Sequence, residues 1–421
     1  MAKASDILGM NARNHSYGSL NRSKAIGIAN SKLKTKALLG KNDISVPQLY
    51  TKISSREALQ EYDFTSIPTS FVIKPSGGSG GNGILIVRRP KNFRDYWLDV
   101  EGNQITLQDI KLHVEDILEG QYGTFGTFHM AFVEEKVPLH PKLKKYVYQG
   151  TPDLRILVFN SVPVMAMLRL PTKESDGKAN LHQGGIGVGI DIASGVTLSG
   201  VHKNRKVRFL PGTKIKLNGI KIPRWKSVLE TAVSAAVITN LQYVGVDILL
   251  HPDKGPMVIE LNARPGLAIQ LANSKGLRFR LERVEGIEIT SVKHGVRVGQ
   301  ALFAERFADK VKADDGLVVI NVVEPGLIQD ADKKRKEIEM LADTSTYRSR
   351  IDRVLAQKLG LIHEESLLWK NSRQQVIEVK IQVKDRWIKS AISVVNLEKN
   401  KYKVILGRLD LQGFLVNPQK D

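Results

Sequence analysis

The chain has 421 residues, is 42% hydrophobic and carries a formal net charge of +20, with 63 Lys and Arg against 43 Asp and Glu. It contains no cysteine, which excludes disulfides and thiolate-bound metals. No apolar run reaches the roughly 18 residues of a membrane helix, and the first twenty residues lack the apolar core of a secretory signal. We therefore expect a cytoplasmic globular protein of two or three domains with no membrane span.

The excess of positive charge attracts anions, whether nucleotides, acidic peptides, nucleic acid or anionic lipid. Nucleic-acid binding is not expected, because the chain has no zinc finger, basic zipper or aromatic-basic signature. Basic stretches such as residues 332–336 (DKKRK) are interpreted as solvated helix faces.

Helices and strands mix through the first two thirds of the chain. Helices are expected at 31–39, ending at Gly40, at 55–62, and at 106–118, where Thr106 and Asp109 form a capping box. Strands are expected at 44–50, 70–74, 84–87 and 130–135, with a hairpin of strands 153–159 and 162–170 around residues 160–161. A helix with apolar positions from Trp225 to Ala236 precedes strands at 244–250 and 257–261. The mixture predicts an α+β architecture with antiparallel sheets.

The last third changes character. A helix near 299–307 and a strand at 316–323 precede the basic run, and short strands then dominate at 338–341, 375–383, 391–395, 403–406 and 414–416. We predict an N-terminal extension (1–30), a main domain (31–312), a linker (313–336) and a small all-β domain (337–421).

Residues 77–83 (GGSGGNG) form a glycine-rich loop between two predicted strands. Its Gly78, Gly80 and Gly83 satisfy G-x-G-x-x-G, with Gly81 beside them, and Lys74 precedes the loop. Because a strand follows rather than a helix, the loop resembles a flap whose backbone N–H groups lie over phosphates, not a dinucleotide-binding turn. The alternative is a flexible hairpin loop without a ligand, although five glycines in seven residues exceed what a turn requires.

Three polar side chains interrupt the two apolar strands near residue 250. Glu260 and Asn262 are two residues apart and share a face of their strand, and Asp247 lies on the strand before it. Oxygen ligands of this kind suit Mg²⁺ (or Mn²⁺), which completes its shell with phosphate and water. The alternative is a solvated sheet face, but a carboxylate among such apolar residues calls for a metal or a basic partner, such as Arg264.

Taken in order, these motifs resemble the ATP-grasp superfamily, and most closely the RimK-type alpha-L-glutamate ligases and their ligase-like subgroup. The matching pieces are Lys32, Lys74, the 77–83 loop, Glu134 with Glu135, Asp153-Leu154-Arg155, Asn180-Leu181-His182, residues 245–249 (GVDIL) and residues 260–267 (ELNARPGL). The resemblance implies two α+β subdomains that clamp ATP. It also implies an ADP-forming ligase that activates a carboxylate as an acyl phosphate and joins it to an amine, with glutamate or another amino acid and a peptide or protein as candidate substrates.

The resemblance also implies residue roles. Lys32, Lys74, the loop glycines, Glu134, Glu135 and Asp153 would hold the nucleotide, and Asp247, Glu260 and Asn262 would hold two metal ions. Arg155, Asn180 and Arg264 would face the transferred phosphate or the substrate.

Alternatives remain open at several of these positions. Taken alone, Lys32 is more typical of an exposed helix lysine. Arg155 and Arg169 could be solvated on their hairpin, and His182 is interpreted as a loop residue or substrate contact. Only about thirty residues precede Lys32, where such ligases usually carry a flavodoxin-like segment, so the substrate is left open. The alternative function is a nucleotide-binding scaffold without turnover.

The end of the chain resembles a retropepsin-like domain, on the basis of Asp343-Thr344-Ser345 after an apolar strand and residues 404–408 (VILGR). Aspartic proteases bring two such loops together, so cleavage by Asp343 would require a homodimer. Ser345 stands where that family has glycine, and zinc is not expected, because the chain has no H-E-x-x-H motif. A non-catalytic binding or dimerisation module is favoured over a protease.

Overall fold

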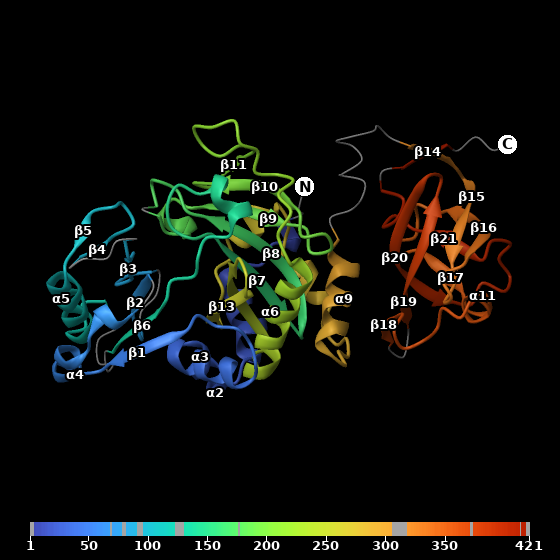
Figure 1. Cartoon of the computed structure of the whole chain (residues 1–421). Helices are drawn as coiled ribbons and strands as arrows, with labels where there is room; N and C mark the ends of the chain where they lie inside the picture. Colours follow the sequence, from blue (N-terminus) through green and yellow to red (C-terminus); the bar gives the residue numbers. More distant parts are fainter. Residues whose placement is uncertain are drawn as a thin grey trace. The chain divides into compact units, whose positions relative to one another are not determined.

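The computed structural model describes residues 4–67, 70–77, 81–90, 96–122, 130–175, 177–304, 318–370, 374–412 and 414–417. The chain divides into two compact units, whose elements are labelled in Figure 1. Unit 1 contains Met1–Asp191 and Gly195–Arg283, and unit 2 contains Ile192–Ser194 and Val284–Asp421. Among the described residues, no helix is both long and apolar enough to cross a membrane.

The first sheet of unit 1 has four antiparallel strands in the order β1 (Leu49–Ile53), β6 (Ala131–Glu135), β2 (Phe71–Pro75) and β3 (Leu85–Val87). The helices α4 (Arg56–Glu61) and α5 (Leu107–Leu118) accompany it, with a two-stranded ribbon of β4 (Trp97–Leu98) and β5 (Gln104–Ile105). The predicted capping box of Thr106 and Asp109 is present at the start of α5. Apolar residues of α5 pack into one core with strand residues such as Phe71. This core covers one face of β2 and β6, so polar side chains of these strands lie on the other face.

The second sheet of unit 1 has seven antiparallel strands. Their order is β11 (Arg205–Val207), β10 (Thr197–His202), β9 (Ile186–Ile190), β8 (Val162–Leu170), β7 (Asp153–Phe159), β12 (Tyr243–His251) and β13 (Gly255–Asn262). Asn160 and Ser161 both have positive φ, which closes the predicted two-residue hairpin between β7 and β8. The helix α6 (Trp225–Thr239) buries its predicted apolar stripe against this sheet.

Short helices complete unit 1. They are η1 (Ala4–Asp6), α1 (Met10–Ala12), η2 (Arg13–Tyr17), η3 (Gly18–Leu20), α2 (Ser23–Ala29), α3 (Lys32–Lys41), η4 (Phe64–Ser66), η5 (Pro141–Tyr146), η6 (Leu181–Gln183), α7 (Ile269–Asn273) and α8 (Arg278–Glu282). Ser31 caps α3, its Oγ accepting from the Lys34 N–H, and the helix runs one residue past Gly40, which was predicted to end it. The difference is small because a glycine in the last turn costs only about 1 kcal/mol.

Unit 2 contains α9 (Val292–Phe303) and a β-barrel. Six strands close into a ring in the order β15 (Val323–Gln329), β16 (Arg335–Ala342), β21 (Val404–Leu406), β17 (Arg350–Asp352), β20 (Arg386–Val395) and β19 (Gln375–Val383), because β19 also pairs with β15. The strand β18 (Leu367–Lys370) extends β19, β14 (Val318–Asn321) pairs with β22 (Phe414–Asn417), and α11 (Arg353–Lys358) follows β17. Apolar residues of these strands form one core. The predicted small all-β domain is therefore present as a barrel with one short helix.

The basic run at 332–336 is not a helix face, so that interpretation was wrong. Residues 331–333 form a turn, where Lys333 has a φ of +65°, and Arg335 and Lys336 begin β16. The preceding strand β15, which the sequence placed in a linker, pairs with both β16 and β19. Pro325 and Gly326 in this strand weaken its sequence signal, because neither residue favours strands.

Candidate active site

A buried carboxylate on the four-stranded sheet binds two lysines. The Glu134 side chain is 4% exposed, and its oxygens lie 2.5 Å from Lys74 Nζ and 2.6 Å from Lys36 Nζ. Lys74 comes from the neighbouring strand β2 and Lys36 from α3, and Lys36 also donates to the Pro47 carbonyl at 2.9 Å. Although burial opposes ionisation, the Lys74 and Lys36 ammonium groups hold the pKa of Glu134 below its usual value. Its carboxylate is thus ionised and fixes both lysines.

The sequence prediction missed Lys36. Its signal was the spacing of four residues from Lys32, which places both side chains on one side of α3. Burial lowers the pKa of Lys36, and its contact with Glu134 opposes that shift.

Glu135, at the end of β6, connects the first sheet to the turn between β12 and β13. Its Oε1 lies 2.8 Å from Lys254 Nζ and 3.7 Å from His251 Nε2, and its Oε2 accepts from the Gln48 N–H at 3.2 Å. The Nδ1 of His251 accepts from two backbone N–H groups, so its ring proton is on Nε2, the atom nearest Glu135. The side chain of Glu135 is therefore engaged in joining the two sheets of unit 1.

Two arginines and two aspartates form a second charged cluster on the seven-stranded sheet. Asp247 on β12 is 2% exposed and lies opposite Arg155 on β7. Arg155 donates to both of its carboxylate oxygens, at 2.7 and 2.6 Å. Arg169 on β8 lies 2.7 Å from Asp247 and 2.5 Å from Asp153. The alternative of solvated arginines is therefore wrong, because both side chains lie within a buried network.

The network shifts the pKa values of its two acids in opposite directions. Burial, reinforced by the Asp247 carboxylate and opposed by Arg169, raises the pKa of Asp153 to about 6. Burial also opposes ionisation of Asp247, but Arg155 and Arg169 outweigh it and hold the pKa of Asp247 below its usual value. Asp247 is thus the firmly ionised member of the pair.

Glu260 and Asn262 lie beside this network on β13. Glu260 pairs in register with Asp247, and the Asn262 Nδ2 lies 3.4 Å from Asp247 Oδ2. Burial and the Asp247 carboxylate raise the pKa of Glu260. Lys32, Arg155 and Arg169 oppose this rise through their charges but do not cancel it.

This arrangement fits a divalent cation. A half-buried carboxylate beside a second carboxylate is costly unless a cation neutralises it. Glu260 and Asn262 offer oxygens of the kind Mg²⁺ prefers, whereas Asp247 already accepts three hydrogen bonds from arginines. The described residues contain no group of three or more His, Cys, Asp or Glu that could hold a metal. The predicted ligands do not form such a group, because they are two acids, Asp247 and Glu260, and one amide, Asn262.

Lys32 connects the two charged clusters. Burial lowers the pKa of Lys32, and the nearby Lys74 lowers it further. The carboxylates of Glu260 on the second sheet and Glu134 on the first act in the opposite direction. The Lys32 ammonium group therefore experiences the charges of both sheets, and it is not the exposed helix lysine that its sequence context also allowed.

The described part of the glycine loop is anchored to α5. Gly81 and Gly83 have φ values of +80° and +72°, whereas Gly78 and Gly80 lie outside the described residues. A Cβ on Gly83 would lie 2.5 Å from Tyr122 Cγ, so only glycine fits there. The His113 Nε2 lies 3.0 Å from the Gly83 carbonyl, which can only accept, and so His113 donates.

The structure does not place Asn180 and Arg264 in either charged cluster. The Asn180 Oδ1 accepts from the His182 N–H at 3.0 Å and caps η6. Arg264 is exposed, and its carbonyl and that of Pro265 accept from Arg13 Nη1 at 3.4 and 3.0 Å. The N-terminal segment thus holds the backbone that carries Arg264.

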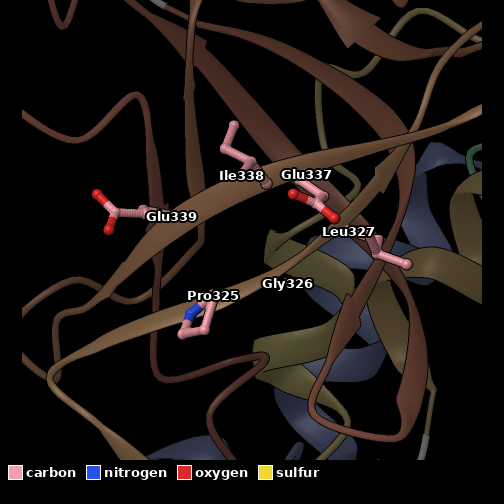
Figure 2. Close-up of a pocket in the computed structure, with 6 residues that line it drawn as sticks. All are labelled: Pro325, Gly326, Leu327, Glu337, Ile338 and Glu339. Atoms are coloured by element: carbon pink, nitrogen blue, oxygen red, sulfur yellow. The ribbon is translucent and has the colours of Figure 1, made fainter.

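The barrel of unit 2 contains a separate candidate residue and a hollow. The Asp343 Oδ1 accepts from the Ser345 N–H at 2.8 Å and from its Oγ at 2.6 Å, and these bonds lower the pKa of Asp343. A hollow of about 440 Å³ lies on the adjacent strands β15 and β16 (Figure 2), lined by Pro325, Gly326, Leu327, Glu337, Ile338 and Glu339.

Residues 12–286 match the family model described as sugar-transfer associated ATP-grasp. The chain is 26% identical over 260 residues to a probable alpha-L-glutamate ligase of Psychromonas ingrahamii, covering 61% of this chain and 63% of that protein. It is 27% identical over 252 residues to the ribosomal protein bS6–L-glutamate ligase of Salmonella newport, covering 59% and 60%. The chain thus spans less than two thirds of either relative.

Solved structures of D-alanine–D-alanine ligases show a distant likeness. The Coxiella burnetii enzyme matches with a TM-score of 0.35 and 11% identity, covering 66% of this chain and 60% of that one. The Bacillus anthracis enzyme complexed with ATP gives 0.34 and 14%, covering 70% of each chain. The likeness in sequence, over residues 12–286, is the stronger of the two.

Proposed function

The chain belongs to the sugar-transfer associated ATP-grasp family, and from that premise we propose that it is an ADP-forming ligase that joins a carboxylate to an amine. The observation that carries the proposal is the position of Lys32 between the two charged clusters. It lies on α3 one turn before Lys36, which contacts Glu134 at 2.6 Å, and α3 also packs against β13, the strand of Glu260. Cations for a polyphosphate and oxygens for a divalent cation therefore meet around one side chain.

In the proposed reaction, Lys32 and Lys74 bind the ATP phosphates. The Glu134 carboxylate positions Lys74, since the two groups are 2.5 Å apart. The γ-phosphoryl group passes to the substrate carboxylate, which gives an acyl phosphate and ADP. The amine then attacks the acyl carbon, and phosphate leaves as the amide forms.

Charge that develops on the transferred group requires nearby cations. Arg155 donates to Asp247 through Nε and Nη2, so its position is fixed before substrate arrives. Glu260 and Asn262, with Asp247, would hold Mg²⁺ or Mn²⁺, which would supply further neutralisation of the phosphates. We propose Asn180 and Arg264 as substrate contacts. The proposed substrates are glutamate or another amino acid, which the enzyme adds to a peptide or protein.

The test is release of ADP and phosphate by the purified chain with Mg-ATP and a pool of amino acids. Release that depends on an added amino acid and disappears in Glu260→Gln supports the ligase. Tight Mg-ATP binding without release, even with candidate peptides added, would instead favour a nucleotide-binding scaffold without turnover.

We also propose that the barrel is a retropepsin-like module that binds a partner or dimerises, and does not cleave peptides. Support comes from Asp343, whose carboxylate is held by Ser345 of its own loop and has a lowered pKa. A catalytic pair that shares a proton needs one acid with a raised pKa.

A further inference from the structure

Beyond β11 the chain forms a second, smaller hairpin that projects from the seven-stranded sheet (Figure 1). An isolated bridge joins Phe209 to Lys216, and the Leu210 N–H donates to the Ile215 carbonyl at 2.8 Å. We call residues 203–217, which contain β11 and this second hairpin, the basic hairpin. Neither charged cluster of the candidate active site includes a residue from it.

Positive charge is concentrated in this part of the chain. Between Asp191 and Glu230 the sequence contains nine Lys and Arg residues and neither Asp nor Glu. The cations of the basic hairpin are all exposed, namely Lys203, Arg205, Lys206, Arg208, Lys214 and Lys216. Lys203 pairs with Glu174 at 2.8 Å, and the other five have no ion-pair partner within the described part of the chain. The hairpin thus presents unneutralised positive charge to solvent.

The tip of the basic hairpin is apolar. Residues 210–213 form its turn, in which the Thr213 N–H donates to the Leu210 carbonyl at 3.0 Å. Phe209, immediately before the turn, is 44% exposed, and Pro211 is exposed as well. A Cβ on Gly212 would have no atom within 4 Å, so the tip is open on its outer side. Apolar side chains are therefore held at the end of a projecting turn with cations behind them.

We propose that the basic hairpin docks the protein on an anionic lipid surface. Phe209 and Leu210 enter the interface between headgroups and acyl chains, where aromatic and aliphatic groups leave water. The flanking cations contact the headgroups, and each Lys or Arg near such a surface strengthens binding roughly fivefold. Two weak signals, a small apolar tip and a cluster of cations, together give reversible attachment.

Other polyanions fit this hairpin less well. A single-stranded nucleic acid is held by aromatic side chains on a platform, and the described hairpin offers one, Phe209. An acidic peptide would neutralise the cations but would leave the exposed Phe209 and Pro211 of the tip in water. A bilayer accommodates both the charge and the projecting tip.

The test is cosedimentation of the full chain with vesicles of phosphatidylcholine alone and of phosphatidylcholine with phosphatidylglycerol. We expect binding to the anionic vesicles that weakens with added salt, because salt screens the exposed cations. Lys214→Glu with Lys216→Glu should weaken it at least about tenfold, given roughly fivefold for each cation. Phe209→Ser should weaken it on its own while keeping the salt dependence.

The matched control is Lys399→Glu with Lys401→Glu, another pair of exposed lysines two residues apart, located in the barrel. It makes the same change in net charge and should leave vesicle binding within about twofold, since scattered surface charges contribute little. ADP formation should be unchanged in all three variants, which shows that they fold. Equal binding to both kinds of vesicle, an equal loss in the control, or tighter hairpin-dependent binding to polyglutamate or single-stranded DNA would overturn the proposal.

Discussion

Arg155 and Asp247 lie opposite each other on β7 and β12 and form two hydrogen bonds, of 2.7 and 2.6 Å. Arg169 adds a third bond to the same carboxylate. A buried carboxylate and two guanidinium groups are tolerable only together, because each alone would be an uncompensated charge. The predicted metal ligand Asp247 is thus also the counter-ion that keeps two arginines inside the sheet.

Asp247→Asn should destabilise unit 1 by about 3 kcal/mol, because it leaves the two arginines without their shared counter-ion. Urea unfolding measures the change. The control is Asp253→Asn in the exposed turn after β12, where the free energy of unfolding should change by less than about 0.5 kcal/mol. Equal stability of the two variants would contradict a structural role for Asp247.

Glu260→Gln should lower turnover by roughly 100-fold or more, as expected when a group that organises transition-state charge is lost. The same change should raise stability at neutral pH. Burial and Asp247 raise the pKa of Glu260, so the stability it contributes is present below its unfolded pKa and is lost as pH rises through its folded pKa.

The stability advantage of Glu260→Gln should therefore be larger at neutral pH than at acidic pH, which pH-dependent thermal unfolding measures. A variant that is less stable than the original chain at neutral pH would mean that Glu260 has a neutralising partner.

The motif order predicted the ATP-grasp superfamily, and the family match confirms it. Local signals also predicted the capping box of α5 and the two-residue hairpin at Asn160. These features succeed because they depend on residues close together in the sequence. The role of Arg169 was left open, because its partners Asp153 and Asp247 come from two other strands. Strand pairing between distant segments decides whether an arginine on a hairpin is solvated or buried.

Lys36 shows the same limit on α3. Four lysines lie within residues 32–41 at positions 32, 34, 36 and 41, and the sequence does not say which of them turn inward. Position 36 is buried because β6 brings Glu134 against the helix, whereas Lys34 stays exposed.

Lys36→Met should therefore raise the KM for ATP and destabilise unit 1 by about 3 kcal/mol, because Glu134 loses one of two partners for a buried charge. Lys34→Met, two residues away on the exposed side, is the control and should leave both quantities unchanged. Steady-state kinetics with varied ATP and urea unfolding give the two readouts. If Lys36→Met changed stability but not the KM, Lys36 would hold the fold without positioning Lys74 for the nucleotide.

Asp343→Asn should leave ligation, folding and partner binding intact. In the original chain the Ser345 N–H donates to the Asp343 Oδ1 at 2.8 Å, and the asparagine Oδ1 of the variant can accept the same bond. Because a lone carboxylate with a lowered pKa has no proton to share, we expect no peptide cleavage by the original chain either. The measurement is cleavage of a peptide library by both proteins from acidic to neutral pH. Cleavage by the original chain that disappears in Asp343→Asn would show a working protease and would require a second Asp343 from another copy of the chain.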